Sequence, residues 1–424
     1  MPRELSSCHS NPWRHWFAVL TATATFALLG AGGLVTSHGV GMAVPDWPNT
    51  YGYNMFFFPV SRWVGGIFYE HSHRLLASAV GLMTVVLALW LYGKTSRPLL
   101  RWTGLAALVA AVATWLVAPR HWRDGVVLAV VGAAAFGASW FWPRCESSPR
   151  WLRRLGFIAF LAVVLQGVLG GLRVVLFKDQ IGIFHATLAQ LFFAVTCSLA
   201  LFTSRWWQQR RNSNLSLHGP SLIVIVTTCV VLGQLILGAA MRHQHAGLAI
   251  PDFPLAYGKA WPAMDAAAVA GYNQRRVEVL DANPITAFQI GLQMAHRLAA
   301  VLILSLVGYC AWSVRRRIGP RSISARLAAG WLGVILPQAA LGAATIWTNK
   351  AADVATAHVL TGALALAVGT LLSLVAFREE SFQPAVESRV VARGLTSPDD
   401  RMPGQVSGWQ LTGTPQRASA TRLD

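Results

Sequence analysis

Residues 74–92 read RLLASAVGLMTVVLALWLY, a stretch that carries no charge after its first residue. It is long enough to cross the hydrocarbon core of a bilayer as a helix. Unpaired backbone groups cost several kcal/mol each in lipid, so an apolar stretch of this length predicts a membrane helix. Ten such spans are predicted, at 16–36, 74–92, 102–118, 125–142, 155–177, 183–203, 221–241, 288–314, 327–347 and 356–377.

The composition supports this prediction. Of the 424 residues, 54% are hydrophobic and 12% are charged, whereas about a quarter of the residues in a soluble domain are charged. The first span follows Arg3 and Arg14 and is rich in small residues, as a signal peptide would be. Its apolar run is longer than a signal core and another span follows, so we expect it to be retained. The sequence therefore predicts an all-α polytopic membrane protein.

The formal net charge of +18 would suggest a nucleic-acid partner in a soluble protein. Here the basic residues cluster in alternate loops, as the positive-inside rule requires of cytoplasmic loops. The charge therefore predicts a cell (plasma) membrane protein with a cytoplasmic N-terminus, and no nucleic acid is needed to explain it. The clusters are Arg3 and Arg14; Lys94, Arg97 and Arg101; Arg144, Arg150, Arg153 and Arg154; Arg205, Arg210 and Arg211; Arg315, Arg316, Arg317, Arg321 and Arg326; and Arg378. The opposite loops carry fewer: Arg120, Arg123, Lys178, Arg242, Lys259, Arg275 and Arg276.

Four short motifs occur twice in the same order, which predicts an internal repeat. They are VPDWP at 44–48 and IPDFP at 250–254, HRLLA at 73–77 and HRLAA at 296–300, LQGVLGG at 165–171 and PQAALGA at 337–343, and HATL at 185–188 and HVLT at 358–361.

The repeated unit contains four helices, an even number, so both copies are expected to insert in the same orientation. The first copy contains two extra spans, interpreted as an inserted helical hairpin with a packing role. The sequence therefore predicts two tandem four-helix-bundle repeats in parallel orientation. The predicted parts are a cytoplasmic N-terminus at 1–15, a first repeat at 16–203 with its hairpin at about 102–142, a cytoplasmic linker at 204–220, a second repeat at 221–377 and a disordered cytoplasmic tail at 378–424.

Four histidines recur at equivalent places in the two repeats: His73 and His185 in the first, His296 and His358 in the second. Each lies at or just inside the outer end of a span, where an ionisable residue usually faces a cavity, a partner or a ligand. Two imidazoles on facing helices of a bundle can bind a haem iron from both sides. Zinc is less suited, because no carboxylate or thiolate completes a tetrahedral set in the second repeat. The pattern predicts two haem sites near the outer surface.

Residues beside these histidines leave two interpretations open. The small residues at 170–171 and 342–343 would admit a flat macrocycle or simply a neighbouring helix. Arg74 and Arg297 each follow a predicted ligand and could pair with haem propionates. They could equally extend outward to the membrane interface.

The two repeats differ three residues before their first histidine, where Glu70 stands in one and Gln293 in the other. At that spacing the side chain shares a helical face with the histidine. A carboxylate in an apolar site can shift its pKa and handle protons. Alternatively, Glu70 is an interfacial residue held by water or by Arg74.

The element Glu70-His71-Ser72-His73-Arg74, the paired PDWP-type loops, the Q-x-x-L-G-G element and the four helix-borne histidines together resemble the haem A synthase family. The resemblance covers nearly all of the membrane region except the hairpin and the tail. It implies that His296 and His358 are axial ligands of a resident haem b. It also implies that His73 and His185 are axial ligands of the substrate haem O, with Glu70 as the catalytic residue.

The implied reaction oxidises a methyl of haem O to a formyl, through successive hydroxylations, to give haem A for terminal oxidases. The implied partners are haem O and an unidentified electron partner, together with haem O synthase and oxidase assembly factors. The chain departs from the family pattern in two ways. It lacks the cysteine pair that some members carry in an outer loop, and its hairpin is not part of the usual eight-helix plan.

The residues leave two other functions open. A di-haem b-type membrane electron-transfer protein would need the same four histidines and would give no special role to Glu70. A transporter is suggested only by the internal repeat. Transporter sites usually lie near the bilayer midplane, whereas these histidines are predicted near the outer surface.

Overall fold

The computed structural model describes residues 11–209, 219–275 and 284–380. Over these ranges the only β-structure is two isolated bridges, Thr50–Tyr53 and Ala256–Lys259. Nine helical stretches in the same ranges are long and apolar enough to cross a membrane, and the longest, Gly65–Val117, contains two helices. The prediction of an all-α protein with about ten candidate spans is confirmed. The predicted tail lies almost entirely outside the described residues.

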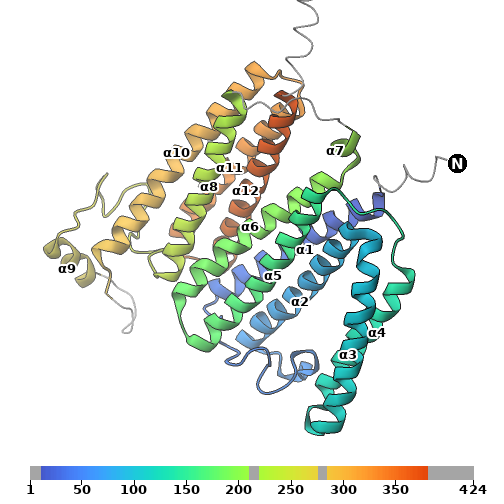
Figure 1. The fold of residues 1–424 in the computed structure, drawn as a ribbon. Helices are drawn as coiled ribbons and strands as arrows, with labels where there is room; N and C mark the ends of the chain where they lie inside the picture. The colour runs from blue at the N-terminus through green and yellow to red at the C-terminus, as the bar shows by residue number, and fades with distance from the viewer. Residues whose placement is uncertain (1–10, 210–218, 276–283, 381–424) are drawn as a thin grey trace, which may run out of the picture. The chain divides into compact units, whose positions relative to one another are not determined.

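Each predicted span coincides with one long helix (Figure 1). The ten long helices are α1 (Pro12–Ser37), α2 (Gly65–Tyr92), α3 (Arg97–Val117), α4 (Trp122–Phe141), α5 (Arg150–Leu176), α6 (Asp179–Thr203), α8 (Gly219–His243), α10 (Ala287–Arg317), α11 (Ile323–Trp347) and α12 (Ala352–Glu380). The connections contain two short helices, α7 (Arg205–Gln209) and α9 (Ala266–Gln274), and the 3₁₀ turns η1 (Met55–Phe57), η2 (Val60–Arg62), η3 (Gly93–Ser96) and η4 (Pro119–His121).

Polar side chains fix several helix starts. Asn11 accepts a hydrogen bond from the Trp13 amide at the start of α1. Thr286 and Gln289 form a reciprocal capping box at the start of α10, and Ser322 caps α11. Such caps satisfy backbone donors that have no partner inside the helix. The apolar runs therefore set the length of the spans, and short polar residues set where they begin.

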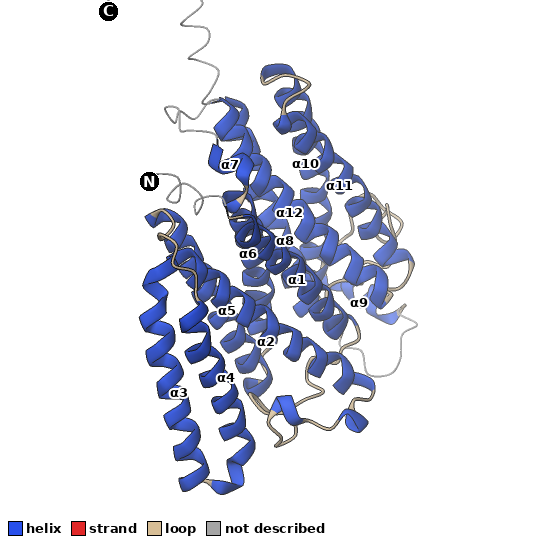
Figure 2. Cartoon of the chain, turned by 90° about the vertical axis from the view of Figure 1, so that its right-hand side faces the viewer, coloured by secondary structure: helices blue, strands red, loops and turns tan. Residues whose placement is uncertain are grey.

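The long helices pack as two groups of four, with the hairpin outside them (Figures 1 and 2). α1, α2, α5 and α6 surround a core that includes Leu87 and Leu199, and α8, α10, α11 and α12 surround one that includes Val307 and Trp331. The groups meet where α12 packs on α1 and α6, and where α6 packs on α8. Phe193 is buried in this contact.

The surface carries many large apolar side chains. Leu116, Val117 and Phe141 on α3 and α4 are 78%, 85% and 91% exposed. A soluble monomer rarely leaves apolar surface this extensive in contact with water. In a bilayer the same side chains face lipid tails and cost nothing. The chain is therefore a multi-pass membrane protein.

α3 and α4 form a helical hairpin where the sequence predicts one. They pack closely at two glycines: a Cβ added to Gly104 would lie 2.6 Å from the Phe136 amide nitrogen, and one on Gly132 would lie 2.9 Å from the Gly104 carbonyl oxygen. Figure 2 shows the hairpin at the edge of the helices. The Asn54 amide donates to Asp124 at 2.6 Å and ties the hairpin to the loop after α1.

Replacing Gly104 by valine is expected to destabilise the hairpin, because the new side chain meets backbone atoms that cannot move aside. Overpacking of this kind costs about 1–3 kcal/mol. The thermal unfolding midpoint of the purified protein should fall. The haem absorbance expected from the sequence should be unchanged at temperatures where the variant is still folded. Gly137→Val is the matched control, because a Cβ at Gly137 meets nothing within 4 Å. Equal midpoints for the two variants would contradict this account of the packing.

Candidate functional site

The four predicted ligand histidines lie in the second or third turn of α2, α6, α10 and α12. These helix starts share one end of the two groups, where α1 and α8 finish. At this end the hydroxyls of Ser37 and Thr356 lie 3.1 Å apart, and a Cβ on Gly182 would touch His243. We call it the histidine end. Side chains of the two helix groups touch here, so the predicted ligands from both halves of the sequence lie at the same end.

The histidines form two pairs. The ring centroids of His296 and His358 are 6.5 Å apart, with an interplanar angle of 66°. His73 and His185 are electrostatic neighbours, and Arg173 is close enough to act on both. The structure therefore brings together the pairs that the sequence predicts.

His73 and His296 each have their Nδ1 buried without a hydrogen-bond partner, whereas the rings of His185 and His358 face the backbone of Gln166 and Gln338. Each of the four imidazoles packs its Cε1 edge against a glycine of an adjacent helix. An added Cβ would lie 2.9 Å from this carbon at Gly32–His73, 3.3 Å at Gly170–His185, 3.3 Å at Gly238–His296 and 3.1 Å at Gly342–His358. Buried polar atoms almost always have partners in a finished structure. The two buried nitrogens without a partner belong to the first histidine of each predicted pair.

The structure shows what two of the small residues at 170–171 and 342–343 contact. Gly170 and Gly342, which the motifs single out, each make room for the imidazole of a neighbouring helix. Gly32 and Gly238 do the same for the other two histidines, and sequence reasoning missed both. Both lie near the end of the helix that precedes a PDWP-type loop, and that position alone does not tell which side chain they face.

Two glutamines hold the backbone of the histidine-bearing helices. The Gln166 side chain donates to the His185 carbonyl at 3.0 Å, and Gln234 donates to the His296 carbonyl at 2.9 Å. Gln166 belongs to the Q-x-x-L-G-G element, so part of that motif positions the helix carrying the second histidine.

Glu70 and Arg74 fasten the loop that follows α1. Glu70, which is 4% exposed, accepts a hydrogen bond from the Val44 amide at 2.9 Å and pairs with Arg74 at 2.7 Å. The Nη1 of Arg74 donates to the carbonyls of Asp46 and Asn49, and its Nη2 donates to that of Val44. The expected propionate contact of Arg74 stays a prediction, while the loop carbonyls are its partners in the structure.

The loop that follows α8 is fastened in the same way. Gln293, which is 2% exposed, accepts from the Ile250 amide at 2.6 Å. Arg297 donates to the carbonyls of Asp252 and Leu255, and its Nε is buried without a partner. Glu70 and Gln293 thus make the same loop contact, one with a carboxylate oxygen and the other with an amide oxygen.

The aspartates of the PDWP-type motifs close a turn. Asp46 accepts hydrogen bonds from the Tyr51 and Gly52 amides at 2.7 and 2.8 Å. Asp252 accepts from Tyr257 and Gly258 at the same distances. The motif therefore builds the loop beside each histidine pair.

His71 is a buried histidine that sequence reasoning did not single out. It is 0% exposed, its Nδ1 lies 3.2 Å from the Thr50 hydroxyl, and its Nε2 has no partner. Its ring packs against Trp63 and Phe58, with centroids 4.7 and 5.1 Å away. The matching position of the other motif is Met294. The two sites therefore differ in a second ionisable residue besides Glu70.

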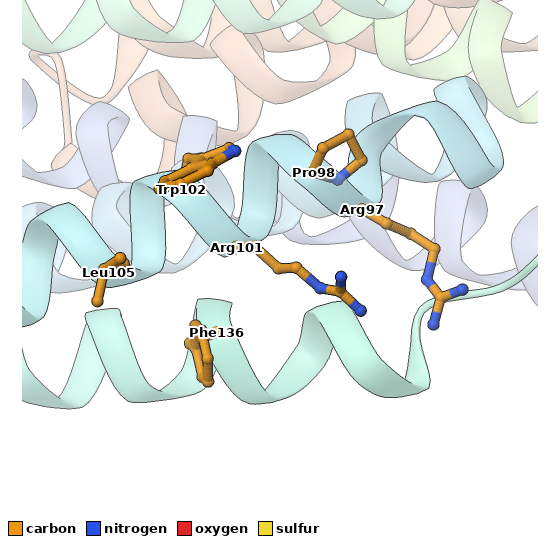
Figure 3. Close-up of a pocket in the computed structure, with 6 residues that line it drawn as sticks. All are labelled: Arg97, Pro98, Arg101, Trp102, Leu105 and Phe136. Atoms are coloured by element: carbon orange, nitrogen blue, oxygen red, sulfur yellow. The ribbon is translucent and has the colours of Figure 1, made fainter.

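A surface pocket lies elsewhere, on the hairpin. Figure 3 shows that it is lined by residues of α3 and by Phe136 of α4. Arg97 donates to the carbonyls of Ser139 and Trp140 there, and Arg101 stacks over the Trp140 ring. These arginines cap the end of α4, and no predicted ligand lies in the pocket.

The family model for cytochrome oxidase assembly proteins, COX15-CtaA, matches residues 120–370, which is more than half of the chain. A protein named "Heme A synthase" from Geobacillus kaustophilus is 25% identical over 378 residues, covering 86% of this chain and 91% of that protein. Those of Halalkalibacterium halodurans and Geobacillus thermodenitrificans are 24% and 23% identical, covering 81% and 90% of this chain and 90% and 98% of their own lengths. These comparisons confirm the resemblance predicted from the motifs, and the chain belongs to the COX15-CtaA family of cytochrome oxidase assembly proteins.

Proposed function

We propose that this protein is a haem A synthase, a membrane oxidoreductase that converts the methyl of haem O into the formyl of haem A for terminal oxidases. The observation that carries the proposal is the presence of two histidine pairs at one end of the helices, in a chain of this family. One pair can keep a haem while the other presents a haem to be altered.

The second pair fits a haem iron. Metal–imidazole bonds are about 2 Å long. If both imidazoles held the same iron, the two bonds and the distance from each nitrogen to its ring centre would separate the centroids by roughly 6 Å. The observed 6.5 Å between His296 and His358 agrees with this. Haem b is the proposed resident cofactor, held by His296 and His358. Haem O is the proposed substrate, held by His73 and His185.

The two helix groups support a further proposal, that they are copies of one unit in parallel orientation. The loop contacts of Glu70 and Gln293, the turns closed by Asp46 and Asp252, and the glycines facing each histidine recur in both groups. In this account 16–203 and 221–377 are the two haem-binding repeats, and the hairpin is an addition to the first.

The orientation in the membrane follows from the charge. The arginine-rich loops lie at the end opposite the histidines, and the positive-inside rule places such loops in the cytoplasm. We therefore propose a cytoplasmic N-terminus and haem sites near the outer face of the plasma membrane.

Bound haem supplies the redox chemistry at its iron. The protein's part is to hold each porphyrin between two imidazoles and to handle the protons released as the methyl is oxidised. Glu70 is the proposed proton-handling residue, because a buried carboxylate can exchange a proton and the second site has an amide in its place. Haem O synthase, oxidase assembly factors and an electron partner are the proposed protein partners.

One observation favours the alternative, a di-haem b-type electron-transfer protein. Glu70 makes the loop contact that Gln293 makes in the other group, so a structural role alone would explain why it is buried. Under this alternative the same four histidines hold two permanent haems, and neither is altered.

Pigment extraction separates the two functions. The protein is expressed together with a haem O synthase in cells that make no haem A, and haems are extracted from membranes and resolved by chromatography. Haem A in the extract is expected from the synthase. Haem b with unchanged haem O would overturn the proposal and support the electron-transfer protein. A His73→Ala variant is the matched control, since it should yield no haem A.

A further inference from the structure

Three basic side chains lie at the histidine end, near the contact between the two helix groups. They are Arg173 of α5, Arg242 in the last turn of α8, and Lys350 in the connection between α11 and α12. Arg242 interacts electrostatically with Arg173, and Lys350 interacts with Arg242. We call these three residues the basic cluster.

Arg173 and Lys350 each lie against a glycine that occupies the same position in the two repeated motifs. A Cβ on Gly41 would lie 3.0 Å from both Nη1 and Nη2 of Arg173, and one on Gly247 would lie 3.8 Å from Cδ of Lys350. Gly41 and Gly247 stand at the same position in the approaches to the two PDWP-type motifs. The loop after α1 therefore has Arg173 of α5 against it, and the loop after α8 has Lys350, which lies between α11 and α12. In each case the cation comes from the helix that precedes the second histidine of the pair, or from the connection to it.

Arg242 lies between them. Its Nη2 donates to the Gly33 carbonyl at 2.8 Å and to the Ser37 hydroxyl at 2.7 Å, so it reaches from α8 across to α1. These partners are neutral. The guanidinium is held at the contact between the two helix groups, and its charge is left uncompensated by them.

The cluster lacks an acidic partner among the described side chains, where none of its three members is in an ion pair. The Nε of Arg173 is buried with no hydrogen-bond partner. Burial, and then the charge of Arg242, lowers the pKa of the Lys350 ammonium. All three side chains are half-buried, and like charges that are partly removed from water repel one another unless an anion pairs with them.

We infer that the basic cluster binds the carboxylates of the haems, with Arg173 serving the first site, Lys350 the second, and Arg242 shared between them. This rests on the proposed function for the identity of the haems. Arg173 is an electrostatic neighbour of both His73 and His185, so an anion on its guanidinium would lie beside the porphyrin that those histidines hold. Arginine binds carboxylates with two parallel hydrogen bonds, which would fix the porphyrin's rotation about the axis through the iron.

A binding experiment without turnover tests the inference. The protein is produced in haem-deficient cells, purified, and titrated with haem b or with its dimethyl ester, which has no free carboxylate. Wild type should prefer haem b by about tenfold or more, the usual worth of a charge-assisted hydrogen bond. The Arg173→Gln/Lys350→Gln variant should lose this preference. Arg173→Lys/Lys350→Arg, which keeps both charges, should retain most of it and shows that the sites still fold.

Arg62→Gln is the control, because Arg62 is an exposed arginine near the loop after α1 that lies over Tyr53. It should leave the preference unchanged. A preference that survives in Arg173→Gln/Lys350→Gln would overturn the inference. If Arg173→Gln/Lys350→Gln keeps the preference for haem b but purifies with less anionic phospholipid than wild type, the cluster binds a lipid phosphate and not a haem carboxylate. Failure of the proposed function is distinguishable, since a protein that makes no haem A can still prefer haem b over its ester.

Discussion

Replacing Glu70 by glutamine is expected to abolish haem A formation while leaving the protein folded and its haem bound. The structure contains the precedent for this change. Gln293 accepts the Ile250 amide just as Glu70 accepts the Val44 amide, so an amide oxygen can hold the loop. What glutamine cannot do is exchange a proton. General acid–base catalysis contributes about 10²- to 10⁴-fold to rates, so the yield of haem A should fall by at least about a hundredfold.

The measurement is haem A per bound haem in purified protein co-expressed with a haem O source. Gln293→Glu is the matched control, and it should keep its activity because it alters the site proposed only to keep a haem. Glu70→Ala separates the two roles of the residue, since it removes the loop contact as well and should lower the thermal unfolding midpoint. Haem A production at the wild-type level by Glu70→Gln would rule out the catalytic role and leave Glu70 as a loop-positioning residue.

The membrane spans could be predicted from sequence because each is an uninterrupted apolar run, and lipid accepts few alternatives to a helix. The pairing of the histidines could also be predicted, since the motifs recur in order and place His296 and His358 at the starts of helices with the same direction. Gly32 and Gly238 could not be identified as imidazole partners. Their role depends on which helices cross and at what height, and a motif on one helix does not specify its neighbour.

The basic cluster could not be predicted from the sequence, for a different reason. Arg242 was counted among loop charges, but α8 continues through His243, so its guanidinium lies within the bundle and reaches α1. Arg173 stands inside the predicted span 155–177, and an ionisable residue there is in itself a signal of function. Its partners come from the other helix group, and only the packing of the groups reveals the cluster that it forms with Lys350.

Removing a histidine of the second pair is expected to remove the resident haem, whereas removing one of the first pair should not. His358→Gly takes away one of the two proposed iron–nitrogen bonds at a site whose other ligand is His296. Haem b in the purified protein should fall to about a tenth or less of wild type, a loss of roughly 1.4 kcal/mol or more of binding free energy, because one of the two proposed ligands of the iron is gone. His73→Gly should keep its haem b and lose haem A formation alone.

Comparing the two variants tests which histidine pair keeps a haem and which presents the haem that is altered. Haem b added together with imidazole should restore low-spin haem absorbance to His358→Gly, since the ring removed beside Gly342 is itself an imidazole, and a misfolded protein would not respond. His121→Gly serves as the control, because His121 is exposed on the hairpin and pairs with Asp124. Should His73→Gly lose the haem b and His358→Gly keep it, the roles of the pairs are reversed. That result would also move the proton-handling role away from Glu70, because the carboxylate would then stand beside the haem that is kept.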